Sequence, residues 1–375
     1  MPMRILLWYW GRRGAGGQLT HALAGALARR PDVEVALSLS AQAELLPETR
    51  ALGLPLDAVP TYAGAAGFAA GFLRLPFLAR RLCRQALAFR AEAVVSVMTH
   101  LWTPLIAPGL ACAGLRYVPM VHDAEPHPGD PGLFWEWRLG RELDAAESAI
   151  AFSDAVAAGL RRRRPGLVVH RMELGALLGG APLPRTRPAE GTVHFICPGR
   201  IRAYKGLDLL RDAWRRLQPR HPEARLLVAG EGNAEALAPG LSALPGVEVR
   251  SGWLAEAEMA RLIAAADAVV LSYREASQSG VAPLALGLGV PVVATPVGGL
   301  VEQLRDGVDG LIARAVTAEA LAEAMATACD PARRAALAAG ARERARRLND
   351  WDGAAARLVA ILGGASAGVP RAEAV

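Results

Sequence analysis

One short segment of this sequence places an arginine and a lysine directly beside two glycines, a pattern suited to binding an anion. Gly199-Arg200 and Lys205-Gly206 follow an apolar run at residues 193–197 and precede residues with helical spacing. A guanidinium forms paired hydrogen bonds with a phosphate, and an ammonium adds a compact charge. We therefore expect the segment to bind a diphosphate and to stabilise the negative charge that develops as a phosphate leaves.

The type of the second cation strengthens this interpretation. The chain has 42 lysines and arginines, and Lys205 is its only lysine. At all other cationic positions of the chain the residue is arginine, so a lysine at this one position indicates a specific function. A solvated loop without a ligand is the alternative interpretation.

A second polar segment follows the apolar run 268–271. It contains the carboxylate of Glu275, and Gln278, Ser279, Gly280 and Val281 come directly after it. An amide, a hydroxyl and backbone N–H groups before a helix suit a sugar or a phosphate. We expect Glu275 to act in catalysis and the other four residues to bind the donor of a transferred group.

Near the N-terminus, Gly16 and Gly17 form a glycine turn between an apolar run and a helical pattern. Backbone N–H groups in such a turn can bind an anion. The glycine spacing is not G-x-G-x-x-G, and the chain has no Walker A motif, so dinucleotide and P-loop sites are not expected. An ordinary turn between strand and helix is the alternative.

A histidine follows another apolar run in the same half of the chain. In Val121-His122-Asp123 the imidazole could donate to a substrate hydroxyl or act as a base. A local structural hydrogen bond between His122 and Asp123 is the alternative, and His127 is a second candidate imidazole.

The positive charge of the chain is concentrated in one segment. The net charge is +6, and the stretch 58–91 contains five arginines and no acid. From Gly67 to Arg90, apolar residues recur every three to five positions beside these arginines. Such a segment can lie on an anionic membrane surface. An amphipathic helix packed on the domain core is the alternative, and no nucleic-acid motif accompanies the charge.

Alternating strands and helices must position all of these residues. Short apolar runs, separated by helical patterns, predict buried parallel strands at 3–10, 33–39, 93–97, 117–121, 148–152, 193–197, 226–229, 247–250, 268–271 and 291–294. We expect an α/β protein with two Rossmann-like, doubly wound domains that face each other across a cleft. The predicted parts are a first domain (1–175), a linker (176–191), a second domain (192–345) and a C-terminal helix that returns to the first domain before a tail (346–375).

Composition places the protein in a reducing compartment. Hydrophobic residues make up 52% of the 375 residues, and the four cysteines are far apart in the sequence. The first apolar run is too short for a signal peptide, and no window is long and apolar enough for a membrane span. We expect a cytoplasmic protein, with attachment to the inner face of the plasma membrane as a possibility that residues 67–90 raise.

Three motifs in combination resemble the family-4 retaining glycosyltransferases of the GT-B fold, also called glycosyl transferases group 1. These are the GR…KG loop at Gly199-Arg200 and Lys205-Gly206, the run GVPVVATPVGGLVEQLRDGVDGLI at residues 289–312, and the early glycine pair. The resemblance covers nearly the whole chain and is strongest at residues 193–330.

The resemblance implies roles for individual residues. It assigns Arg200 and Lys205 to the donor diphosphate and His122 to the neighbourhood of the transferred sugar. Gly16 and Gly17 would lie near the donor phosphate and the acceptor. The turn at Gly252-Trp253-Leu254 would contact the nucleobase.

One position departs from the family pattern. The family has two glutamates separated by seven residues, and the first corresponds to Glu275 with a register uncertain by one. The second position is Leu284, which cannot bind ribose hydroxyls as a glutamate does.

The expected function is transfer of a sugar from a UDP- or GDP-sugar to a glycan or lipid-linked acceptor. The resemblance implies retention of configuration, and we expect a role in bacterial cell-surface or exopolysaccharide synthesis. Neither a metal nor another cofactor is expected, because the two cations neutralise the leaving group. A nucleotide-sugar epimerase, a phosphorylase and a non-catalytic binding homologue are the alternatives.

Overall fold

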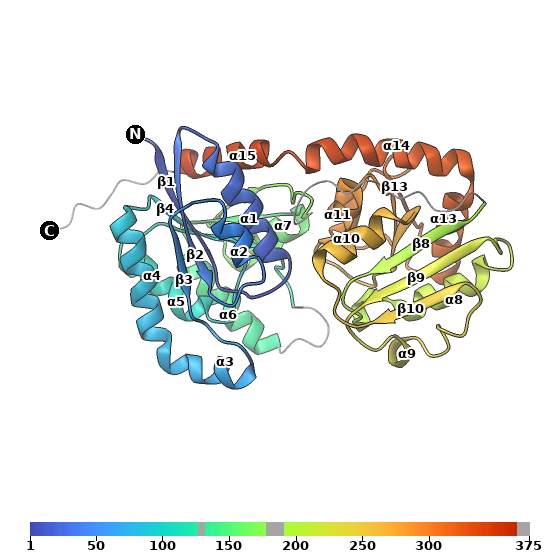
Figure 1. Ribbon diagram of the computed structural model, residues 1–375, viewed down its shortest axis with the longest axis horizontal. Coiled ribbons are helices and arrows are strands. Elements are labelled where there is room, and N and C mark those ends of the chain that lie inside the picture. Colours follow the sequence, from blue (N-terminus) through green and yellow to red (C-terminus); the bar gives the residue numbers. More distant parts are fainter. Residues whose placement is uncertain (127–131, 178–190, 366–375) are drawn as a thin grey trace. The chain divides into compact units, whose positions relative to one another are not determined.

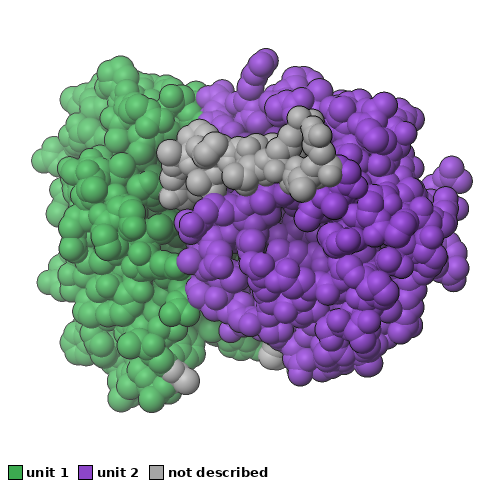
Figure 2. All heavy atoms as spheres, turned by 45° about the vertical axis from the view of Figure 1, so that its right-hand side comes forward, with its two compact units in different colours: residues 1–126, 130–173, 351–375 green, residues 127–129, 174–350 purple. Residues whose placement is uncertain are grey.

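The computed structural model describes residues 1–126, 132–177 and 191–365. The chain divides into two compact units, which Figure 2 distinguishes by colour. Of the described residues, unit 1 contains 1–126, 132–173 and 351–365, and unit 2 contains 174–177 and 191–350. Most of the predicted linker, residues 178–190, lies outside the described residues.

Unit 1 is built on a sheet of seven parallel strands. The strands are β1 (Met3–Tyr9), β2 (Val33–Ser40), β3 (Leu56–Val59), β4 (Ala93–Ser96), β5 (Tyr117–Val121), β6 (Ser148–Ala151) and β7 (Val168–Arg171). Their order is β3-β2-β1-β4-β5-β6-β7. The strand order reverses beside β1, and ligands of open α/β sheets bind at the carboxyl ends of the strands near such a reversal.

Helices cover both faces of this sheet (Figure 1). They are α1 (Ala15–Ala28), α2 (Leu46–Arg50), α3 (Ala65–Gly71), the 3-10 helix η1 (Phe72–Arg74), α4 (Leu75–Phe89), α5 (Thr103–Cys112), α6 (Gly132–Asp144), α7 (Asp154–Arg163) and α15 (Trp351–Ala365). Leu6 and Trp8 of β1, together with Trp10 directly after the strand, share one buried cluster with residues of α4 and α5. Helix α1 packs against α15.

Unit 2 repeats the architecture with six parallel strands. These are β8 (Val193–Pro198), β9 (Ala224–Gly230), β10 (Val247–Ser251), β11 (Ala268–Leu271), β12 (Val292–Ala294) and β13 (Gly310–Ile312), in the order β10-β9-β8-β11-β12-β13. Its helices are η2 (Ala203–Lys205), α8 (Leu207–Leu217), α9 (Ala234–Leu237), α10 (Glu256–Ala264), α11 (Val281–Gly287), α12 (Leu300–Gln303), α13 (Ala318–Cys329) and α14 (Pro331–Leu348).

Two separate apolar clusters show that the second sheet is covered on both faces. Residues of β8 such as Phe195 share one cluster with α8 and α13. The next residue, Ile196, belongs to a second cluster that includes α10, α11 and α14. Side chains of consecutive strand residues point to opposite faces, so each unit is a doubly wound layer structure, and the predicted fold class is confirmed.

The segment from Gly67 to Arg90 forms α3, η1 and α4. Leu75, Leu78 and Leu82 of α4 are buried in the cluster with β1, so the predicted amphipathic helix with its stripe in the core is present. Leu73 and Phe77 are 83% and 67% exposed, however. In the described part of the chain, no helix has both the length and the apolarity to cross a membrane.

Candidate active site

The GR…KG loop leaves β8 at the carboxyl edge of the second sheet. The N–H of Gly199 donates to the carbonyl of Ala229 (2.8 Å), and the N–H of Ile201 donates to the carbonyl of Glu231 (2.8 Å). These bonds extend the pairing with β9 beyond the strand. Gly199 has a φ of +98° and Gly206 a φ of +63°, a region that favours glycine. The two glycines thus shape the loop that carries the cations.

The ammonium of Lys205 is buried inside this loop. Lys205 is only 8% exposed, and its Nζ lies 4.9 Å from the centroid of the Tyr273 ring. A Cβ on Gly199 would lie 3.0 Å from Nζ, so the ammonium rests against the backbone of that glycine. Burial lowers the pKa of Lys205, but Tyr273 and Tyr204 outweigh this effect and raise the pKa above its ordinary value. The group is therefore charged at neutral pH.

Neither loop cation has a carboxylate partner. Across residues 1–126, 132–177 and 191–365, no ion pair joins a carboxylate to Lys205 or Arg200. Arg200 is exposed on the same loop. The ring of Tyr273 stabilises this charge but does not neutralise it, as a carboxylate would. The surroundings of Lys205 therefore favour an anionic ligand.

The loop after β11 is bonded directly to the GR…KG loop, because β8 and β11 are neighbours in the sheet. The hydroxyl of Ser272 donates to the carbonyl of Lys205 (2.8 Å). The N–H of Arg274 donates to the carbonyl of Tyr204 (2.7 Å), and its guanidinium pairs with Asp208 of α8. Arg274 is therefore already paired, whereas Lys205 and Arg200 form no ion pair with the carboxylates that the structure describes.

The predicted donor-binding residues 278–281 are held in place by Gln303. Its side-chain amide accepts from the N–H of Ser279 and donates to the carbonyl of Ser279, both at 2.8 Å. The hydroxyl of Ser279 is buried and accepts from the N–H of Val281 (3.1 Å). Ser279 thus shapes the loop, whereas Gly280 and the neighbouring Glu275 are exposed. Sequence patterns contained no signal for Gln303.

Two glycines of the run 289–312 are required by close backbone packing. A Cβ on Gly298 would lie 1.9 Å from the carbonyl oxygen of Ala276, and one on Gly299 would lie 2.0 Å from that of Ser277. The N–H of Gly299 donates to the carbonyl of Ala276 (3.1 Å). The glycine pair therefore lets the turn before α12 support the polar loop after β11.

Trp253 and Leu254 follow β10 at the same edge of the sheet. Two strand positions separate β10 from β8, so this turn is not a direct neighbour of the Lys205 loop. Trp253 is 44% exposed, and Gly252 before it has a φ of +143°. Trp253 is thus partly exposed on unit 2.

Leu284 lies in the core and not at the edge of the site. It is 8% exposed on α11 and belongs to the apolar cluster that includes Ile196 and Ile263. A leucine at this position contributes to packing, and no ribose hydroxyl could find a hydrogen-bond partner in its side chain.

In unit 1, packing alone explains one of the two predicted glycines. A Cβ on Gly16 would lie 2.4 Å from the Tyr9 ring, whereas one on Gly17 would make only ordinary contact, at 3.8 Å from the same ring. Helix α1 begins at Ala15 without a side-chain cap, and the N-terminal end of a helix carries partial positive charge. Packing therefore does not require a glycine at position 17, so a substitution of Gly17 would test the predicted ligand role without a clash against Tyr9.

His122 comes directly after β5, two strand positions from β1. Its ring lies 4.7 Å from the ring of Phe152, centroid to centroid. Burial lowers the pKa of His122 to about 4, although Asp123 opposes the shift. The imidazole is therefore neutral near pH 7 and suited to hydrogen bonding with a hydroxyl. The other candidate, His127, lies outside the described residues.

Comparison with known proteins agrees with this architecture. The sequence model of the family described as glycosyl transferases group 1 matches residues 192–330. A D-inositol 3-phosphate glycosyltransferase of Xylanimonas cellulosilytica is 30% identical, over 94% of this chain and 92% of that protein. Shorter matches to proteins of the same name cover about a third of the chain, for example 33% of it at 36% identity in Segniliparus rotundus.

Solved structures show the same fold. Sucrose-phosphate synthase of Thermosynechococcus elongatus superimposes with a TM-score of 0.75 at 18% identity, covering 98% of this chain and all of that one. The Anabaena protein Alr3699/HepE in complex with UDP-glucose gives a TM-score of 0.71 at 17% identity, covering 96% of this chain and all of the other.

Proposed function

The chain belongs to the glycosyltransferases of group 1, and we propose that it transfers a sugar from a nucleotide-diphosphate sugar with retention of configuration. One observation carries the proposal: the buried, charged Lys205 has no carboxylate partner in the described part of the chain. A diphosphate supplies the missing negative charge. Because the Anabaena structures contain UDP and UDP-glucose, a UDP-sugar is the first donor to test.

In the proposed reaction an acceptor hydroxyl attacks the anomeric carbon from the side on which the diphosphate leaves. The bond from the anomeric carbon to the phosphate oxygen breaks, and the bond to the acceptor oxygen forms. The acceptor proton passes to the departing phosphate. Lys205 and Arg200 stabilise the charge on this leaving group, and neutral His122 is proposed to donate a hydrogen bond to a sugar hydroxyl.

We propose that the two cations replace a metal in this role. The single Asp-x-Asp sequence of the chain, Asp350-Trp351-Asp352, does not occupy a loop at the carboxyl edge of either sheet. It lies where α15 begins, and Asp352 pairs there with Arg29 of unit 1 at 2.6 Å.

A donor assay tests the proposed function. We expect incubation with UDP-glucose and an acceptor to release UDP, and NMR of the glycoside to show the anomeric configuration of the donor. Incubation of the donor without an acceptor tests for an epimerised sugar nucleotide, and incubation of a glycan with phosphate tests for phosphorolysis. An epimerised product would identify an epimerase, and phosphorolysis would identify a phosphorylase; either result would contradict the proposed transferase. Absence of calorimetric binding for both UDP and GDP would indicate a non-catalytic binding homologue.

We also propose that the acceptor is lipid-linked, as in cell-surface or exopolysaccharide synthesis, and that unit 1 contacts an anionic membrane. Exposed large apolar residues continue from α4 onto α5 and α6, which pack beside one another. They are Phe72, Leu73, Phe77, Leu101, Leu105, Leu133, Phe134 and Trp137. Large apolar patches flanked by arginines suit insertion between anionic headgroups.

Vesicle flotation tests the membrane proposal. Arg81 already pairs with Asp57 at 2.5 Å, so the informative arginines are Arg80 and Arg84. We expect R80E/R84E to lose most binding to phosphatidylglycerol vesicles, because each basic residue near such a surface contributes about 1 kcal/mol. The control R220E/R333E makes the same charge change on unit 2. Equal flotation of both variants would contradict the proposal.

A further inference from the structure

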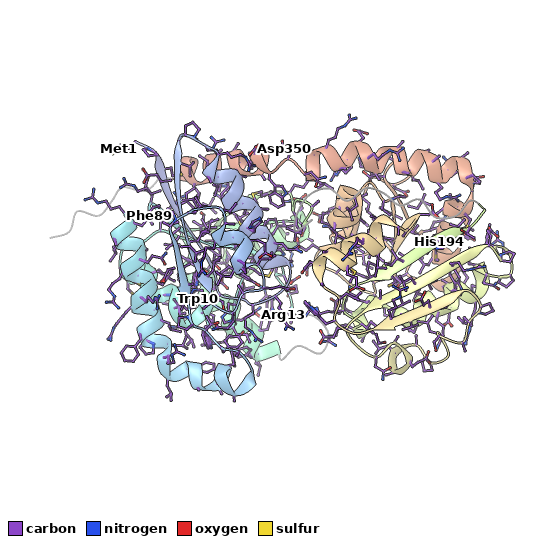
Figure 3. All side chains as sticks on the ribbon, viewed as in Figure 1. Met1, Trp10, Arg13, Phe89, His194 and Asp350 are labelled. Carbon is purple, nitrogen blue, oxygen red and sulfur yellow. The ribbon has the colours of Figure 1, made fainter. Side chains whose placement is uncertain are left out.

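A second cationic cluster lies at the carboxyl edge of the unit 1 sheet. Arg12 follows β1, between Trp10 and Arg13, which are labelled in Figure 3. Tyr62 follows β3 and His100 follows β4, while Arg138 belongs to α6. The guanidinium carbon of Arg12 lies 4.8 Å from the centroid of the Tyr62 ring, and the Tyr62 hydroxyl lies 3.0 Å from Nε2 of His100.

The hydrogen bonds around His100 determine which ring nitrogen carries the proton. The N–H of Trp102 donates to Nδ1 of His100 (3.2 Å), so Nδ1 must be the unprotonated acceptor. The proton of the neutral ring is then on Nε2, which donates to the oxygen of Tyr62. Burial, followed by the charges of Arg138 and Arg12, lowers the pKa of His100 to about 4. His100 is therefore neutral near pH 7 and fixed in this tautomer.

This tautomer leaves the hydroxyl hydrogen of Tyr62 directed away from His100. Arg12 is half-buried; one of its nitrogens donates to the carbonyl of Ala63 (2.6 Å), and no carboxylate pairs with it among the residues that the structure describes. Its remaining N–H groups and the Tyr62 hydroxyl are all donors. The charge of Arg138 adds to that of Arg12 at this position, as their shared effect on His100 shows.

One acid that interacts with Arg138 is buried among other partners. Glu142 faces Arg138 from the same helix, but it is fully buried and accepts from the Tyr117 hydroxyl (2.7 Å) and from Thr99. Burial raises the pKa of Glu142, which disfavours its charged form. A half-buried site with several donors, in which Arg12 has no carboxylate partner among the described residues, favours an anion.

We propose that Arg12, Tyr62 and Arg138 bind an anionic group of the acceptor, a phosphate or a carboxylate, and that His100 positions Tyr62 for this contact. The identification of the ligand as an acceptor rests on the proposed transferase function, whereas the anion site itself does not depend on that function. The chemistry follows from the donors: a guanidinium stacked on an aromatic ring presents its N–H edge in a fixed plane, which matches two oxygens of one anion.

Binding of inorganic phosphate tests the site without any transfer reaction. The K205M background removes the main competing cation of unit 2. In this background we expect phosphate to raise the melting temperature progressively with concentration. We expect R12Q or Y62F to weaken the apparent affinity at least about tenfold, since hydrogen bonds to charged groups contribute about 1.5–3 kcal/mol. The matched control R50Q should bind phosphate as K205M alone does.

Acceptor kinetics then identify the source of the anion. With otherwise wild-type protein, we expect R12Q to raise KM for phosphorylated or uronate acceptors at least about tenfold, with little change for neutral sugars and for the donor. H100Q should show a smaller rise, and Y62F should retain the fold. Phosphate binding in K205M that is insensitive to R12Q and Y62F would overturn the site. Phosphate binding that depends on Arg12, without transfer to any acceptor, would uphold the site and contradict the transferase function instead.

Discussion

Replacement of Lys205 by methionine is expected to lower the rate of sugar transfer at least about a hundredfold, the usual effect of removing one group that stabilises a developing oxyanion. The ammonium is buried against Tyr273 and Gly199 and has no carboxylate partner in the described part of the chain. Calorimetry with UDP should show affinity at least about tenfold weaker. The measurements are initial rates of UDP release and the dissociation constant of UDP.

Stability distinguishes a lost ligand contact from a damaged fold. Methionine has a similar length and keeps the packing of the side chain, but it loses the contact between the ammonium and the Tyr273 ring, which contributes about 0.5–2 kcal/mol. We therefore expect the melting temperature of K205M without nucleotide to lie only slightly below that of the wild type. R202M changes an exposed arginine of the same loop, and we expect nearly wild-type rates for it. If K205M and R202M had equal rates, the leaving-group role of Lys205 would be wrong.

Replacement of Gly206 by alanine is expected to destabilise unit 2 strongly. Gly206 has a φ of +63°, and its Cβ would lie 2.2 Å from the carbonyl oxygen of Ser272. The left-handed conformation alone costs about 1 kcal/mol for alanine, and the clash with backbone adds to it, for a total of roughly 3 kcal/mol. Chemical denaturation of unit 2, followed by a probe such as Trp214 fluorescence, measures this change.

Gly307 provides a matched control for the clash. Its φ is +73°, and a Cβ there would meet no atom within 4 Å. G307A should therefore lose only about 1 kcal/mol. The excess loss in G206A reports the contact between the GR…KG loop and the end of β11, and it should be accompanied by weaker UDP binding. Equal losses in the two variants would mean that this contact does not stabilise the loop.

The local sequence was sufficient to predict the buried central strands. Residues 5–10 and 117–121 are continuous apolar runs, because a parallel strand in the middle of a sheet is covered on both faces. The structure has β1 at Met3–Tyr9 and β5 at Tyr117–Val121. Three short strands were not predicted: β3 (Leu56–Val59), β7 (Val168–Arg171) and β13 (Gly310–Ile312), all at sheet edges. An edge strand has one neighbour and less burial, so its apolar signal is weak.

The sequence also located the loops of the candidate site but not the contacts within them. Glycines around a lone lysine after a strand are a local pattern, and they indicated the loop that holds Arg200 and Lys205. The Tyr273 ring under the ammonium could not be predicted, because β8 and β11 become neighbours only through the crossover order of the sheet. The same holds for Gln303, which holds Ser279 from 24 residues away in the chain.

The sequence by itself determined two doubly wound α/β halves, a loop with two cations and the likeness to a family of sugar transferases. Only the tertiary structure decided that Lys205 is buried without a carboxylate partner among the described residues, that Arg81 is already paired with Asp57, and that Gly16 makes room for Tyr9. The reason is physical: strand and turn signals lie within a few residues, whereas the charge and burial of a side chain depend on neighbours that folding brings from distant segments.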